Sequence, residues 1–261
     1  MYLLELKSHS EFGLVKFIGD AIPRYAILSH TWGAENDEVT FRDIMDGTGK
    51  SKAGYSKIEF CEKQAASDNL KYFWIDTCCI DKSSSAELQE AITSMFRWYH
   101  DATRCYVYLS DVSVGDCDSN SHQLPWESAF RASRWFTRGW TLQELLAPDS
   151  VEFFCQEGKR LGDKRSLERQ IHEITRIAVQ ALHGTPLSQF SINERFQWAE
   201  QRQTMREEDW AYSLLGIFDI CIPIMYGEGK KNAVNRLTKE IYETLKYGEE
   251  SEYQEGRPSA P

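Results

Sequence analysis

The chain of 261 residues is long enough for one large domain or two small ones, and it can bury a substantial core. Its formal net charge of −10 argues against broad binding to nucleic acid or to anionic membranes, because both require clustered Lys and Arg side chains. Charges at Glu5 and Lys7 interrupt the first apolar run, which is therefore not a signal peptide, and no later apolar run is long enough to cross a bilayer. We expect a cytoplasmic protein whose seven cysteines are reduced thiols.

Strand and helix patterns alternate through the first 155 residues. Short runs of apolar and aromatic residues, each followed by a polar loop, predict buried strands. After the second of these runs, Ser84 and Glu87 form an S-x-x-E capping box, and apolar residues then recur at helical spacing. We expect strands at residues 24–29, 71–76, 104–110 and 151–155, and helices near 54–70, 84–99 and 127–133.

This alternation predicts an α/β fold, in which a parallel sheet is flanked by helices. The second half of the chain reads as mostly helical, around residues 164–174, 191–202, 207–218 and 229–246. We therefore expect one domain over residues 1–247, with an α/β core at 1–160 and a helical extension at 161–247. The acidic, apolar-poor residues 248–261 read as a linker or frayed tail.

Polar residues follow the predicted strands at the points where ligands bind in open parallel sheets, beyond the carboxyl ends. Several residues in this region also have a purely structural interpretation. His30 could be a histidine with its hydrogen bonds satisfied, Asp76 could cap a turn, Arg138 could form an ion pair, and the tryptophans could belong to the core. Histidine spacing and the lack of a C-x-x-C pair predict no metal site. The residues are Ser29, His30, Trp32 and Gly33 after the first strand, Asp76 and Asp81 after the second, and Ser110 and Asp111 after the third.

The segment RGWTLQELLAP at residues 138–148 contains one acidic group, Glu144. Thr141 and Glu144 are spaced as a T-x-x-E capping box, so spacing alone favours a role for Glu144 as a helix cap. A carboxylate in a cleft can alternatively stabilise a cationic transition state. Both interpretations remain open at this point.

Three blocks of the sequence resemble the HET domain, the heterokaryon incompatibility domain of filamentous fungi: YAILSHTWG at 25–33, FWIDTCCIDK at 73–82 and RGWTLQEL at 138–145. Residues 208–237 also resemble its C-terminal region, so the similarity extends over about residues 1–247. The chain looks most like the effector domain of incompatibility proteins that join HET to an NTPase and a repeat sensor. This resemblance implies self-association and a sensor region as partner, with no nucleic acid and no membrane.

HET domains are in turn thought to be distant relatives of TIR domains, which implies a TIR-like (Rossmann or flavodoxin-like) core. WTLQEL is similar to the W-C-x-x-E-L pattern that carries the catalytic glutamate of TIR enzymes, with Thr141 in place of the cysteine. The resemblance implies NAD+ as substrate without a cofactor, and Glu144 as the catalytic residue facing an open pocket. The implied substrate-binding residues are Ser29, His30, Trp32, Gly33, Asp76, Arg138 and Trp140.

Three functional hypotheses follow from these observations. In the first, a cell-death effector of fungal non-self recognition cleaves the nicotinamide–ribose bond of NAD+ upon oligomerisation. In the second, the domain is a non-catalytic scaffold that self-associates and recruits partners. In the third, a nuclease or phosphohydrolase binds Mg2+ through Asp76 and Asp81.

Overall fold

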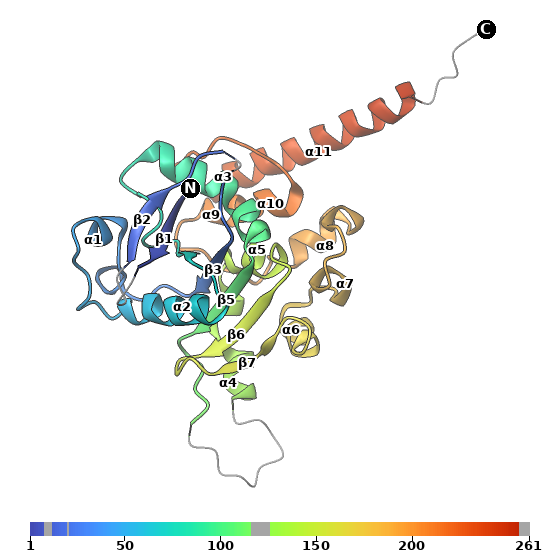
Figure 1. Cartoon of the computed structure of the whole chain (residues 1–261). Helices are drawn as coiled ribbons and strands as arrows, with labels where there is room; N and C mark the ends of the chain where they lie inside the picture. Colours follow the sequence, from blue (N-terminus) through green and yellow to red (C-terminus); the bar gives the residue numbers. More distant parts are fainter. Residues whose placement is uncertain (8–11, 20, 116–125, 256–261) are drawn as a thin grey trace.

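Seven strands form one sheet among the residues that the computed structural model describes, which are 1–7, 12–19, 21–115 and 126–255. The strand order is β2-β1-β4-β3-β5-β6-β7 (Figure 1). The strands are β1 (Tyr2–Leu6), β2 (Phe12–Lys16), β3 (Tyr25–His30), β4 (Tyr72–Trp74), β5 (Arg104–Leu109), β6 (Val151–Cys155) and β7 (Arg160–Asp163).

The four central strands, β4, β3, β5 and β6, pair in parallel, as the alternating pattern predicted. In chain order they are arranged 2-1-3-4, which is the order of flavodoxin-like doubly wound folds. The chain runs from β3 to β4, its neighbour on one side, and then crosses over to β5, the neighbour of β3 on the other side. The carboxyl ends of β3 and β5 therefore flank the point where such folds bind ligands.

The predicted parallel core is confirmed, and the sheet also carries antiparallel strands on both sides of it. Strand β1 pairs antiparallel with β2 and with β4, and β7 pairs antiparallel with β6. We did not predict β1, β2 or β7 from the sequence, and β7 extends the sheet three residues past the expected core boundary at residue 160. The edge strands β2 and β7, and the neighbouring β1, are only partly buried, so they lack the continuous apolar pattern that identified the central strands.

Helices cover both faces of the sheet. Successive side chains of a strand point to opposite faces, so residues of β5 contact a different helix on each face. Tyr108 of β5 packs against Phe60 of α2 on one face, with ring centroids 4.9 Å apart. On the other face, Cys105 contacts the carbonyl of Glu144 in α5. The helices of the core are α1 (Phe41–Met45), α2 (Tyr55–Ser67), α3 (Ser85–Asp101), α4 (Glu127–Ala132) and α5 (Thr141–Leu146).

The start of α3 confirms the predicted cap in part. The Ser84 hydroxyl accepts a hydrogen bond from the backbone N–H of Glu87, so the helix begins where the sequence indicated. The Glu87 carboxylate does not complete the box. It accepts a hydrogen bond from Lys16 of β2 at 3.0 Å instead, which fastens the edge hairpin to the helix.

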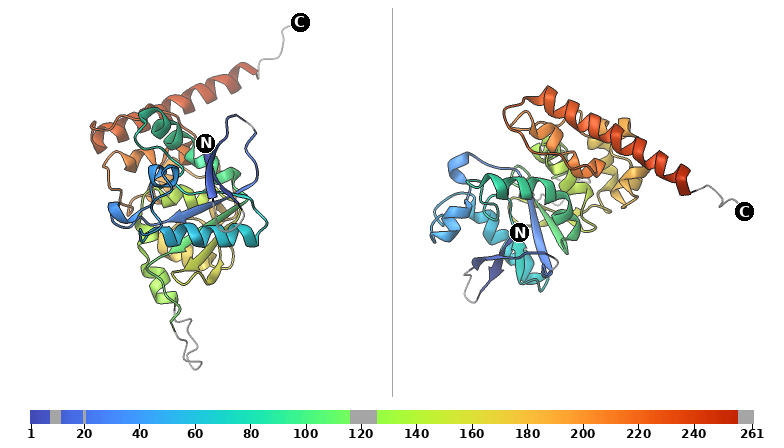
Figure 2. Two further views of the ribbon diagram at one scale, coloured as in Figure 1. Left: turned by 60° about the vertical axis from the view of Figure 1, so that its left-hand side comes forward. Right: turned by 90° about the horizontal axis from the view of Figure 1, so that it is seen from above.

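The residues after β7 are helical in the described chain, as the sequence predicted. Helix α11 extends beyond residue 247, where we expected the tail to begin, and Figure 2 shows it projecting from the rest of the molecule. Residues 256–261 of the expected tail lie outside the described residues. The helices are α6 (Glu168–Thr175), α7 (Val179–Leu182), α8 (Ile192–Gln197), α9 (Asp209–Tyr212), α10 (Leu215–Phe218) and α11 (Lys230–Glu255).

The extension is joined to the core by backbone pairing beside α5. The N–H of Gly139 donates to the carbonyl of Gln203 at 2.8 Å, and the N–H of Gln203 donates to the carbonyl of Thr137 at 2.6 Å. A Cβ atom at residue 139 would lie 2.4 Å from the methyl carbon of Thr204, so only glycine allows this approach. The helical extension thus directly supports the segment that leads into α5.

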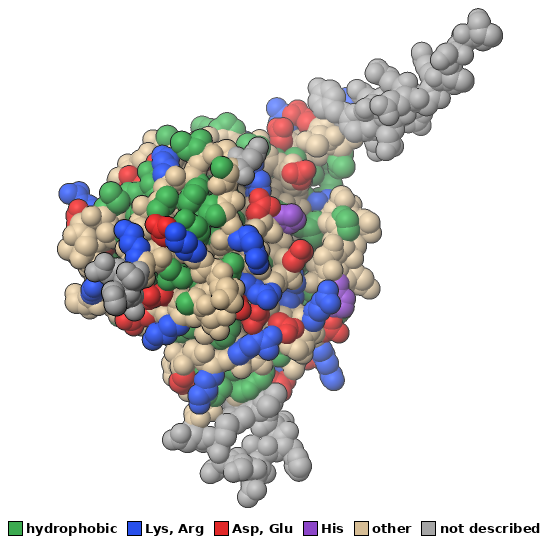
Figure 3. Space-filling model, viewed as in Figure 1, with side chains coloured by type: hydrophobic (Ala, Val, Ile, Leu, Met, Phe, Trp, Pro, Cys, Tyr) green, Lys and Arg blue, Asp and Glu red, His purple; other side chains and the backbone are tan. Residues whose placement is uncertain are grey.

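No helix in the described part of the chain is long and apolar enough to cross a membrane. On the face seen in Figure 3, Lys and Arg side chains lie among Asp and Glu side chains instead of forming one continuous patch of a single sign.

Candidate active site at the carboxyl edge of the sheet

The structure brings Ser29 and Glu144 together, although they are 115 residues apart in the chain. Ser29 lies near the carboxyl end of β3 and is completely buried. Its hydroxyl accepts a hydrogen bond from the indole N–H of Trp135 at 2.8 Å and donates one to the Glu144 carboxyl group. The Glu144 side chain is therefore fixed over the end of β3, beside the ligand-binding point of the fold.

The capping interpretation of Glu144 was wrong. The N-cap residue of α5 is Trp140, and no side chain of the described residues caps this helix. The Thr141 hydroxyl donates instead to the carbonyls of Trp135, at 2.6 Å, and Arg138, at 3.0 Å. The carboxyl group of Glu144 is bonded to Ser29, and so it points toward the sheet and not toward the helix start.

The expectation that Glu144 faces an open pocket was also wrong for this conformation. The residue is only 6% exposed. Burial, followed by the nearby charge of Asp76, raises the pKa of Glu144 to about 8, although Ser29, Arg138 and Tyr99 act in the opposite direction. The carboxyl group is consequently mostly protonated at neutral pH.

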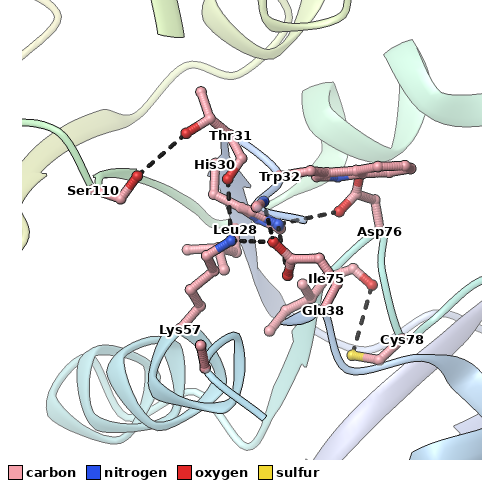
Figure 4. Close-up of polar contacts among 12 residues, drawn as sticks. Leu28, His30, Thr31, Trp32, Glu38, Lys57, Ile75, Asp76, Cys78 and Ser110 are labelled. Carbon is pink, nitrogen blue, oxygen red and sulfur yellow. Dashed lines mark hydrogen bonds and ion pairs between the residues drawn. The ribbon is translucent and has the colours of Figure 1, made fainter. Parts of the chain in front are cut away.

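A second group of polar side chains lies beside the first, at the ends of β3 and β4 (Figure 4). The ammonium group of Lys57 in α2 donates to the carboxylate of Glu38 and to the carbonyl of Thr31, the latter at 3.0 Å. The Nε2 atom of His30 lies 4.0 Å from an oxygen of Glu38 and 3.7 Å from Oδ1 of Asp76. Two carboxylates therefore converge on one buried histidine.

His30 and Asp76 both retain buried polar atoms without a hydrogen-bond partner in the described part of the chain. These atoms are both ring nitrogens of His30 and Oδ1 of Asp76. Burial and then the charge of Lys57 lower the pKa of His30 to about 3, so the ring is neutral near pH 7. Buried polar groups are normally paired, since leaving one unpaired costs about 1–3 kcal/mol. Such groups in a cluster identify a candidate binding site for polar ligand atoms.

Of the remaining predicted site residues, Trp32 and Gly33 lie at the site, whereas Trp140 faces the helical extension. The indole N–H of Trp32 donates to Oδ2 of Asp76 at 2.8 Å, so these two residues are brought together as expected. The N–H of Gly33 donates to the Glu38 carboxylate at 2.6 Å, which fixes the loop after β3. Burial raises the pKa of Asp209 in the helical extension and the Trp140 side chain acts in the opposite direction, so Trp140 lies beside that part of the chain.

Arg138 lies between the two groups. Its charge acts on the pKa of both Glu144 and His30, and its guanidinium carbon is 5.9 Å from the centre of the Trp32 ring. Its carbonyl accepts a hydrogen bond at 2.8 Å from Arg202, a buried cation of the extension that also donates to Thr141 at 2.8 Å. The extension thus contributes directly to the support of the site.

We did not single out Glu38, Lys57 and Arg202 as site residues from the sequence. Lys57 carried a readable signal, because it precedes Cys61 by four residues and Ala65 by eight, and so lies on the buried stripe of its helix. A lysine at such a position indicates a buried ion pair. Glu38 and Arg202 gave no comparable signal.

The other polar residues near the strand ends have structural roles. The carboxylate of Asp81 accepts hydrogen bonds from the backbone and hydroxyl of Ser83 within a turn. Asp111 accepts from the Ser133 hydroxyl and from the backbone of Arg134. The Ser110 hydroxyl lies 3.4 Å from that of Thr31. In the described residues, no group of three or more His, Cys, Asp or Glu side chains is arranged to hold a metal ion.

Comparison with known proteins shows which family the chain is related to. Residues 25–127 match the family model described as "Heterokaryon incompatibility protein (HET)". The chain contains a HET domain. It is also 56% identical over 242 residues to "Vegetative incompatibility protein HET-E-1" of Podospora anserina. That similarity covers 92% of this chain but 18% of the relative, so the chain spans less than a fifth of the relative's length.

The HET resemblance seen in the sequence is therefore confirmed. The HET model matched by residues 25–127 includes the first two motif blocks, and the site residues from Ser29 to Asp76 lie within it. No solved structure matches the chain.

Proposed function

We propose that this HET domain is a cell-death effector of heterokaryon incompatibility that cleaves the nicotinamide–ribose bond of NAD+ when several copies assemble. The similarity to HET-E-1, whose name describes a vegetative incompatibility protein, supports the biological role. Most of HET-E-1 lies outside the aligned region, which suits a sensor region that controls assembly. The observation that carries the catalytic part is the hydrogen bond between Ser29 and Glu144 at the carboxyl edge of the sheet.

The reaction requires little from the protein. Nicotinamide leaves as a neutral pyridine from a pyridinium, so no general acid is needed. The ribose carbon develops cationic character, which a carboxylate of Glu144 stabilises until water attacks, giving ADP-ribose, nicotinamide and a proton. Ser29, itself held by the Trp135 indole, orients that carboxylate.

The burial of Glu144 supports a requirement for assembly in this proposal. A protonated carboxyl group cannot stabilise a cation, and burial is the main reason that the pKa of Glu144 is raised. Opening the site to water and substrate would lower that pKa toward the ordinary carboxyl value. In this proposal, assembly therefore creates both access and negative charge in one step.

The test compares artificially clustered wild type with the Glu144→Gln variant, following NAD+ loss and nicotinamide release. Glu243→Gln, which alters an exposed carboxylate on α11, is the matched control. We expect the wild type and Glu243→Gln to turn over NAD+, and Glu144→Gln to lose at least about 100-fold, the usual scale for one charge-stabilising group. Equal turnover by the wild type and Glu144→Gln would reject the proposal.

A non-catalytic scaffold is the second candidate, and the burial of Glu144 favours it. In that case Glu144 would act only as a neutral hydrogen-bonding group, which glutamine replaces well. A Glu144→Gln variant that assembles normally and still kills cells would support the scaffold. Loss of killing with intact assembly would support the enzyme.

A further inference from the structure

Two cationic side chains converge on the indole ring of Trp32. The ammonium nitrogen of Lys82 lies 3.8 Å from the ring centre, and the guanidinium carbon of Arg138 lies 5.9 Å from it. Trp32 follows β3, Lys82 follows β4, and Arg138 precedes α5. Three separate segments thus meet at the carboxyl edge of the sheet, above His30 and beside Glu144.

Neither cation forms an ion pair within residues 1–7, 12–19, 21–115 and 126–255. The carboxylate next to the ring is that of Asp76, and its Oδ2 atom accepts a hydrogen bond from the indole N–H of Trp32. Lys82 interacts electrostatically with Asp76 and Glu38. In a chain of net charge −10, two cations beside one ring, neither in an ion pair among the described residues, still indicate a site for an anion. The positive charges of Lys82 and Arg138 both act on the buried His30 below them.

The groups beneath the ring point to a sugar next to that anion. Nε2 of His30 and Oδ1 of Asp76 are 3.7 Å apart, and both lack a hydrogen-bond partner among the described residues. His30 is 5% exposed, so a ligand reaches these atoms only when the site opens, as the proposed function requires. A hydroxyl group between these two atoms can donate a hydrogen bond to the carboxylate and make a second one with the imidazole.

We propose that Lys82 and Arg138 bind the diphosphate of a nucleotide, with the Trp32 ring as a stacking surface and the His30–Asp76 pair as the contact for a ribose hydroxyl. The ammonium of Lys82 lies over the ring face where a planar base would stack. A bound nucleotide would therefore replace it there, and the ammonium would move to a phosphate oxygen, where charge-assisted hydrogen bonds are stronger. This inference refines the proposed NAD+ site, but it can be tested without cleavage.

The test measures binding to the artificially clustered protein by titration calorimetry, with ADP, inorganic pyrophosphate and adenosine as separate probes. We expect ADP to bind more tightly than pyrophosphate, and adenosine to bind at least tenfold more weakly than ADP. Lys82→Met should weaken ADP binding at least tenfold, and Lys82→Arg should restore most of it. Lys230→Met is the matched control, because its ammonium lies 4.5 Å from the centre of another tryptophan ring, that of Trp210.

The outcomes separate this inference from the proposed function. Unchanged ADP affinity in Lys82→Met, or adenosine binding as tightly as ADP, would overturn the diphosphate site even if Glu144→Gln abolished NAD+ cleavage. Lys82-dependent ADP binding without any NAD+ cleavage would support the site and reject the enzyme. If Lys82→Met fails to fold, Arg138→Gln tests the same charge requirement, with retained ADP affinity counting against the proposal.

Discussion

The pH dependence of folding stability offers a direct test of the environment of Glu144. The pKa of this group is about 8 in the folded protein against 4.5 for an ordinary glutamate. Because the folded value is the higher one, the stabilising effect of the bound proton is fully present below pH 4.5. It is lost as the pH rises through about 8.

The magnitude follows from the proton difference between the two states. Between pH 4.5 and about 8 the folded state binds one more proton at Glu144 than the unfolded state. The free energy of unfolding should therefore fall by about 1.4 kcal/mol per pH unit. His30 acts in the opposite direction, because its pKa is lowered from 6.5 to about 3, so its contribution rises with pH up to 6.5.

The window from pH 6.5 to about 8 lies above most of the His30 titration, and other groups that titrate near it are common to both proteins, such as Lys164, whose pKa burial lowers to about 8. Across it the wild type should lose about 2 kcal/mol relative to Glu144→Gln, whose side chain carries no proton to release. Urea unfolding of both proteins, followed by tryptophan fluorescence at several pH values, measures this difference. Parallel stability curves for the two proteins would refute the burial argument.

Three further predictions concern stability and can be checked by the same urea unfolding. Lys57→Met should cost about 3–5 kcal/mol, since it leaves the buried carboxylate of Glu38 without its partner; a loss under about 1 kcal/mol would contradict a buried ion pair. Gly139→Ala should cost about 1–3 kcal/mol by overpacking against Thr204, and adding Thr204→Ser should recover most of it; no recovery would place the strain elsewhere. Trp135→Phe should cost about 1–3 kcal/mol by removing the indole hydrogen bond, and an unchanged midpoint would argue against that bond.

The four central strands could be predicted because they are buried on both faces. Strand β3 is buried at all six positions and β5 at five of six, so each appears in the sequence as a continuous apolar run. The outer strands β1, β2 and β7 could not be predicted in this way. They are only partly buried, and their identity depends on the neighbours with which they pair.

The site was less accessible to sequence reasoning. The local T-x-x-E pattern favoured a cap, but the Thr141 hydroxyl bonds to Trp135 and accepts from Arg202, which lies 61 residues further along the chain. A contact of that range has no local signature, and it overrode the capping preference. The resemblance to a known family, and not spacing, indicated that Ser29 and Glu144 belong together.

The pairing of Gly139 with Gln203 has a consequence for the smallest autonomous folding unit of this protein. A fragment that stops after the last strand would lack Arg202 and Gln203. The N–H of Gly139 and the carbonyls of Thr137 and Arg138 would then lose these partners and be left to bind water. The segment bearing Glu144 would then lose its anchorage. Recombinant versions trimmed to the sheet should accordingly be insoluble or misassembled, and they would be poor material for judging what the intact domain does.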